Sequence, residues 1–169
     1  MAFLIWLEST SISVWVREAP TLWAFPFILF LHTLGLGILV GLSVAMNLAV
    51  LGFAPGVRAA PMRLFYPVMW LGFWINAVSG FLLLLAYPAK ALTNPVFYAK
   101  LILIFWAVIN LQWLYTELFV SSAQKYLEDA SLRVRRVAML TLALWFGSIF
   151  AGRFLAYTHN VLMASELSF

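Results

Sequence analysis

The sequence predicts an all-α integral membrane protein, a four-helix bundle with a short amphipathic N-terminal helix that lies in the membrane interface. Hydrophobic residues make up 65% of the 169 residues, and the mean hydropathy is +1.00, which excludes a water-soluble domain. Four apolar stretches are each long enough to cross a hydrocarbon layer of ~30 Å. Charged residues amount to 9% and fall mainly between these stretches. We therefore expect one membrane domain covering residues 1–169.

The N-terminal segment 1–20 differs from the four stretches because polar and charged residues interrupt its aromatic and aliphatic ones. This mixture is typical of a helix that lies in the headgroup region. The segment lacks the basic start and the small-residue cleavage site of a signal peptide. We predict an interfacial helix here, followed by a turn marked by Pro20 and Pro26.

The four spans are expected at about residues 25–52, 65–86, 96–119 and 137–160. The first contains a single ionisable side chain, His32, followed by Gly35, Gly37 and Gly41. Ionisable residues inside a span are disfavoured and usually serve a function. The second span carries a stripe of small and polar residues, including Asn76 and Gly80, that suits close helix packing.

Basic residues predict the orientation of the chain, because four spans place both termini on the same side of the membrane. The loops after the first and third spans carry Arg58, Arg63, Lys125, Arg133, Arg135 and Arg136. By the positive-inside rule these loops face the cytoplasm, and both termini face outward. The formal charge of +4 is therefore explained by basic residues that set the orientation of the chain in the membrane, and no nucleic-acid partner is expected.

Four ionisable side chains from three spans are predicted to converge on the outer half of the bundle. At ~1.5 Å per residue from the cytoplasmic end, His32 lies at roughly 30 Å and His159 at roughly 34 Å. The same count places Lys100 at ~26 to 32 Å and Arg153 at ~25 Å. The two histidines therefore differ in height by about one helical turn.

Each of these side chains also has an interfacial interpretation. His159 ends a span, where a histidine contacts water, and Lys100 near a helix start can extend to the headgroups. Arg153 lies more than a turn inside, with no carboxylate nearby in sequence. It needs an anion from the outer face, a lipid phosphate or a bound ligand.

Haem b fits these residues. His32 and His159, on different helices, can occupy its two axial positions. Arg153 and Lys100 can neutralise its propionates. Gly35, one turn from His32, and Gly152, on the face of His159, leave room for a porphyrin. The chain contains no cysteine, which excludes c-type haem and iron–sulfur clusters. The predicted function is one-electron transfer, with electrons from a quinol or a partner subunit.

Other interpretations stay open. His32 with His159 and Met163, which are four residues apart, could bind Cu(I), although two nearby cations would repel it. A cofactor-free accessory subunit of a larger membrane complex, or a homo-oligomer, would use the polar residues of the spans as interhelical contacts. A quinone site near Trp15, Trp23 and the outer cations is compatible with haem binding and with its absence.

Several segments resemble an uncharacterised family of bacterial four-span membrane proteins: LESTSISVWVRE, FPFILFLHTLGLGILVG, NAVSGFLLL, NPVFYAKLILI and AGRFLAY. More distantly, the chain is similar to the copper-resistance protein D family and to membrane-type protoporphyrinogen oxidases. That similarity rests on His32 and Lys100, and in the oxidases such positions imply haem b and activity. This chain lacks their second histidine a few residues after the first; Ser43 and Asn47 are the polar residues further along the span.

Overall fold

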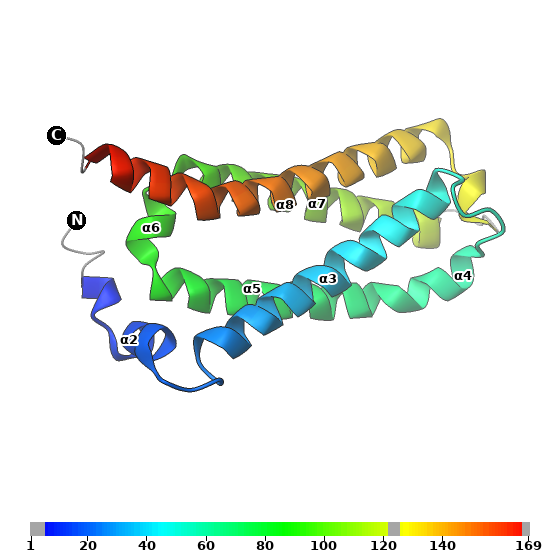
Figure 1. Cartoon of the computed structure of the whole chain (residues 1–169). Coiled ribbons are helices and arrows are strands. Elements are labelled where there is room, and N and C mark those ends of the chain that lie inside the picture. The colour runs from blue at the N-terminus through cyan, green and yellow to red at the C-terminus, as the bar shows by residue number, and fades with distance from the viewer. Residues whose placement is uncertain (1–5, 122–125, 167–169) are drawn as a thin grey trace.

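The computed structural model describes residues 6–121 and 126–166, the side chains of residues 121 and 156–166 excepted. Every regular element in this part of the chain is a helix, as the all-α prediction requires (Figure 1). Four helical stretches are long and apolar enough to cross a membrane: Phe25–Val50, Ala59–Ala86, Pro95–Val120 and Leu132–Leu155. The four-helix bundle is confirmed.

The N-terminal helix α2 (Ser11–Glu18) lies against α5 at one end of the bundle (Figure 1). Thr10 caps it, because the Thr10 side chain accepts a hydrogen bond from the Ser13 amide. Val16 is buried, and Arg17 donates to the carbonyl of Ala86 at the end of α5. The interfacial segment was predicted over 1–20, of which residues 1–5 lie outside the described part.

The first two long helices are α3 (Phe25–Val50) and α5 (Tyr66–Ala86). Before α5 come the short helix α4 (Ala59–Met62) and a 3₁₀ turn (Arg63–Phe65), so the helical path starts six residues earlier than the expected 65–86. Pro61 permits this early start because it falls in the first turn of α4, where a backbone N–H has no intrahelical partner.

The other two long helices are α7 (Pro95–Tyr115), which the short α6 (Pro88–Leu92) precedes, and α8 (Leu132–Glu166). Asn94 caps α7 by accepting a 2.9 Å hydrogen bond from the Val96 amide, and α7 continues as a π-helix over Thr116–Ser121. The helix α8 starts before the expected residue 137 because Ser131 accepts a hydrogen bond from the Val134 amide at its first turn.

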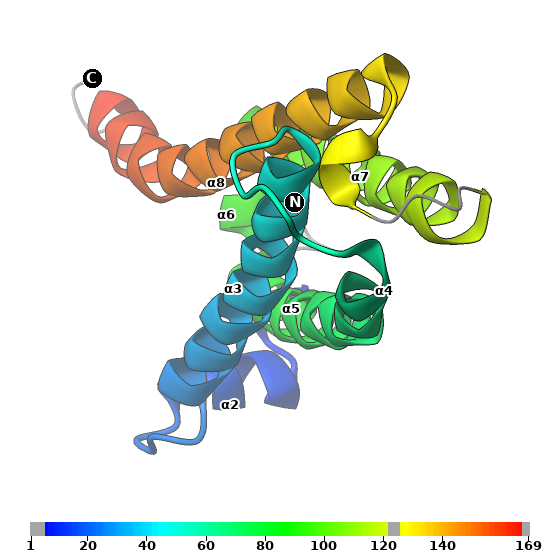
Figure 2. The same ribbon diagram turned by 90° about the vertical axis from the view of Figure 1, so that its right-hand side faces the viewer.

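The long helices form two pairs, α3 with α5 and α7 with α8 (Figure 1). The pairs cross at an angle (Figure 2). Within the first pair the backbones touch, since a Cβ atom added at Gly35 would lie 2.6 Å from the Asn76 nitrogen and 2.8 Å from the Gly72 oxygen. Glycine at positions 35 and 72 therefore permits the close approach of α3 and α5.

The two ends of the bundle differ in what they carry. At one end, called the inner end here, the loops 51–58 and 126–131 lie side by side, because the Leu127 amide donates to the Val57 carbonyl at 3.0 Å. The outer end holds α2, α6 and the end of α8 (Figure 1). The loops predicted to be cytoplasmic thus meet at one end.

The buried apolar side chains are concentrated toward the inner end. The larger core cluster runs from Leu39 on α3 to Trp145 on α8 and includes Leu127 of the inner loop. A separate small cluster, Val16, Ile28 and Ala86, seals the outer end between α2, α3 and α5. The level of His32 lies between these two clusters.

Candidate functional site

The imidazole of His32 on α3 is held by α5. Its Nδ1 lies 3.0 Å from the backbone oxygen of Asn76 and 3.3 Å from the hydroxyl oxygen of Ser79. In return, the side-chain Nδ2 of Asn76 donates a 2.7 Å hydrogen bond to the His32 carbonyl. His32 and Asn76 are therefore joined twice, once through each residue's side chain.

Gly80 provides the space that the imidazole occupies. A Cβ atom added at this position would lie 2.9 Å from His32 Cε1 and 3.2 Å from Nδ1, closer than side chains normally approach. The ring therefore packs on the backbone of α5 one turn beyond Asn76. The small and polar stripe of this helix was expected to serve helix packing in general, and the structure shows that part of it receives His32.

Lys100 belongs to α7, and its side chain packs against α8 at Gly152. A Cβ atom added at Gly152 would be 3.5 Å from the ammonium Nζ and 3.6 Å from Cε, which is ordinary van der Waals contact. The side chain is half-buried. No carboxylate of the described residues forms an ion pair with Lys100. The ion pair that the described residues do form joins Arg17 to Glu18 on α2.

Arg153 and His159 lie on the last part of α8. The Arg153 side chain is exposed on the surface of the helix, so in a membrane it faces lipid or the headgroups. The residue His159 belongs to α8, but its side chain is outside the described part of the structure. In both views α3 and α8 diverge toward the outer end (Figures 1 and 2). The approach of the two imidazoles remains a prediction.

The two glycines predicted to accommodate a porphyrin have different surroundings. Gly152 faces the Lys100 side chain, whereas Gly35 is buried against the backbone of α5. The missing side chain of Gly35 therefore serves the contact between two helices. The sequence could not distinguish these roles, because a glycine beside a ligand and a glycine beside a helix have the same local pattern.

The structure thus forms two groups of contacts: His32 with Asn76, Ser79 and Gly80 in the first helix pair, and Lys100 with Gly152 in the second. The set offers one imidazole and one ammonium among small residues. Within residues 6–121 and 126–155, no three His, Asp or Glu side chains converge as a metal-binding group. The described donors, one imidazole and one ammonium, suit a ligand that takes an imidazole and carries negative charge.

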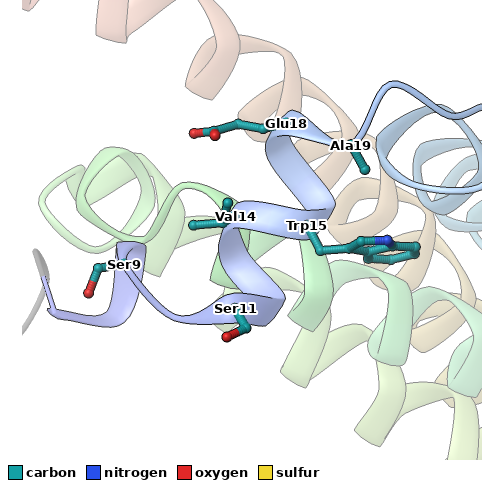
Figure 3. Close-up of a pocket in the computed structure, with 6 residues that line it drawn as sticks. All are labelled: Ser9, Ser11, Val14, Trp15, Glu18 and Ala19. Atoms are coloured by element: carbon teal, nitrogen blue, oxygen red, sulfur yellow. The ribbon is translucent and has the colours of Figure 1, made fainter.

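A separate groove of about 520 Å³ lies on the exposed face of α2 (Figure 3). Its lining comprises Ser9, Ser11, Val14, Trp15, Glu18 and Ala19. The Trp15 and Glu18 side chains extend from α2 in different directions (Figure 3). This is the region in which a quinone was predicted near Trp15 and Trp23. The groove shares no residue with the His32 site.

No protein-family model, curated protein or solved structure matches the chain. The resemblance to four-span bacterial membrane proteins and, more distantly, to the copper-resistance protein D family and the membrane-type oxidases therefore stays a prediction. Of the two residues that carry the distant part of it, His32 lies against α5 and Lys100 lies against Gly152 of α8.

Proposed function

We propose that this chain is a haem b-binding electron-transfer protein of the bacterial inner membrane, with His32 as an axial ligand in the outer half of the bundle. The observation that carries the proposal is the arrangement of His32. It is the one ionisable group of the first span, and α5 fixes its imidazole. The second helix pair carries Lys100, a cation for which the described structure shows no carboxylate partner.

The residues present fit the group in type. An imidazole is the usual axial ligand of haem b, and Lys100 supplies a charge that a propionate would neutralise. His159 is the proposed second axial ligand, and Arg153 the second partner of the propionates. Because Gly80 and Gly152 have no side chain, the side chain of His32 can lie at Gly80 and that of Lys100 at Gly152. When bound, haem supplies a one-electron couple, and electrons would be exchanged with a quinol or a partner membrane subunit.

Two other functions compete with haem binding. Cu(I) could be bound by His32, His159 and Met163, but the charges of Lys100 and Arg153, which are predicted at a similar height, would oppose a cation there. A cofactor-free accessory subunit is favoured by one observation, the exposed positions of Gly37 and Gly41 on α3. Nothing lies within 4 Å of a Cβ atom added at either glycine. A helix of a partner subunit, or of a second copy, could approach α3 there.

An absorption spectrum of the purified protein tests the proposal. We expect a Soret band and a sharp α-band on reduction in the unaltered chain, and loss of both in His32→Ala. Added imidazole should restore the spectrum of that variant if the bundle is intact. In His159→Ala we expect a weakened α-band, because one of the two axial ligands is missing.

Other outcomes would overturn the proposal in favour of a stated alternative. A colourless protein that binds copper tightly would support copper handling. A colourless, metal-free protein that is unstable until a partner subunit is co-expressed would support the accessory role.

A further inference from the structure

We propose that Asn76 and Gly80 are positioning residues for His32: they hold its imidazole with the proton on Nδ1, and Nε2 is the atom left to bind a metal. The metal-binding part of this inference rests on the proposed haem function. The assignment of the proton rests on the hydrogen bonds of His32 alone.

The hydrogen bond to the backbone oxygen of Asn76 determines where the proton lies. A carbonyl oxygen can only accept, so the Nδ1 of His32, 3.0 Å away, must donate. A neutral imidazole carries one N–H, and its other nitrogen then has a free lone pair. The Nε2 of His32 is therefore the nitrogen available as a ligand.

The hydroxyl group of Ser79 agrees with this assignment. Its oxygen lies 2.6 Å from the Ile75 carbonyl, to which the hydroxyl donates its proton. Having used its proton, the Ser79 oxygen can only accept from His32 Nδ1, 3.3 Å away. The Ser79 hydroxyl also lies 3.2 Å from the Asn76 carbonyl, a second acceptor for its proton. With that proton donated to a carbonyl, both neighbours of Nδ1 are acceptors, which matches a proton on Nδ1.

Two further contacts fix the position of the ring. The Nδ2 of Asn76 donates to the His32 carbonyl at 2.7 Å, which ties the backbone of α3 to α5 at the level of the imidazole. Gly80 allows the ring to lie on α5, since an added Cβ would be 2.9 Å from Cε1. A histidine that binds a metal commonly donates its other N–H to a backbone carbonyl, and this partner sets the tautomer and the ring orientation.

The tautomer can be measured without any cofactor. The chain has two histidines, so the haem-free His159→Gln variant labelled with ¹⁵N-histidine gives the NMR signals of His32 alone. We expect the Nδ1 signal in the protonated range and the Nε2 signal in the unprotonated range. A proton on Nε2, or an equal mixture of the two tautomers, would overturn the inference.

The variant Gly80→Ala tests the positioning role, with Gly41→Ala as its matched control, because nothing lies within 4 Å of a Cβ added at Gly41. In Gly80→Ala we expect a mixture of tautomers in the haem-free protein and 10- to 100-fold weaker haem binding, the usual effect of losing such a partner. In Gly41→Ala both should stay as in the unaltered chain. Unchanged tautomer and haem affinity in Gly80→Ala would overturn the inference.

The outcomes separate this inference from the proposed function. If the unaltered protein binds no haem, the haem proposal fails, and the NMR measurement still decides whether α5 fixes the proton on Nδ1. If the unaltered protein binds haem and Gly80→Ala binds it equally well, the haem proposal stands and the positioning role fails. The NMR measurement on His159→Gln also decides the case in which Gly80→Ala does not fold.

Discussion

The indole nitrogen of Trp145 on α8 donates a 2.9 Å hydrogen bond to the hydroxyl oxygen of Ser43 on α3, and both side chains are almost completely buried. Ser43 also accepts from Asn47 Nδ2 at 3.3 Å. This contact links the two helix pairs within the larger core cluster, at a level nearer the inner end than His32. This hydrogen bond joins α3 to α8 in the inner half of the bundle, whereas the contacts of His32 and Lys100 lie in the outer half.

The substitution Trp145→Phe should lower the stability of the bundle. It removes the interhelical hydrogen bond while keeping an aromatic ring in the core, and such a bond contributes about 1 kcal/mol. The thermal unfolding midpoint in detergent should fall relative to the unaltered chain. Trp106→Phe is the control, because Trp106 is 52% exposed and should tolerate the change. Equal midpoints in the two variants would contradict this role of Trp145.

Two glycines on the same helix should respond in opposite ways to alanine. In Gly35→Ala the new Cβ meets the α5 backbone at 2.6 Å, and we expect a loss of about 1 to 3 kcal/mol, as for other overpacked interiors. In Gly37→Ala nothing lies within 4 Å, and alanine's better helix propensity should keep or raise stability by up to about 1 kcal/mol. Comparison of the unfolding midpoints checks both. A stable Gly35→Ala would show that α3 and α5 are further apart than described.

Lys100 and Arg153 should differ in their influence on the proposed haem. Lys100 is half-buried and lies against Gly152 of α8, whereas Arg153 is exposed. A nearby cation favours electron uptake, so Lys100→Gln should make the midpoint potential more negative by on the order of tens of millivolts. Solvent and headgroups screen an exposed charge, so Arg153→Gln should cause a smaller shift. A redox titration followed by the α-band measures both. A larger shift for Arg153→Gln would place the propionates at the surface of α8.

The four long helices could be predicted from the sequence because apolar length is a local property of each segment. Uninterrupted stretches around His32 or Lys100 must be helical in a membrane, where the backbone has no other hydrogen-bond partners. The first residues of these helices could be predicted less closely. The early starts of the second and fourth long helices depend on local details, Pro61 in a first turn and Ser131 at a cap.

The partners of His32 could not be predicted, because they depend on which helices pair and in which register. Asn76 is 44 residues away in the sequence, and no local pattern shows that its carbonyl faces the imidazole. Gly80 likewise differs from Gly35 only in what packs against it. The contact between His32 and His159 remains a prediction from helix length.

The orientation in the membrane gives a prediction that is independent of any cofactor. The chain has no cysteine, so single cysteines can be introduced at either end of the bundle. Ser9 is exposed near α2, and Ala54 is exposed in the inner loop beside Arg58. Because that end carries most of the arginines, the positive-inside rule places it in the cytoplasm. In intact cells a membrane-impermeant maleimide should label Ser9→Cys and spare Ala54→Cys, whereas both should be labelled after permeabilisation. The reverse pattern in intact cells would place the His32 site in the cytoplasmic half, and its electron partners would then have to be sought on that side.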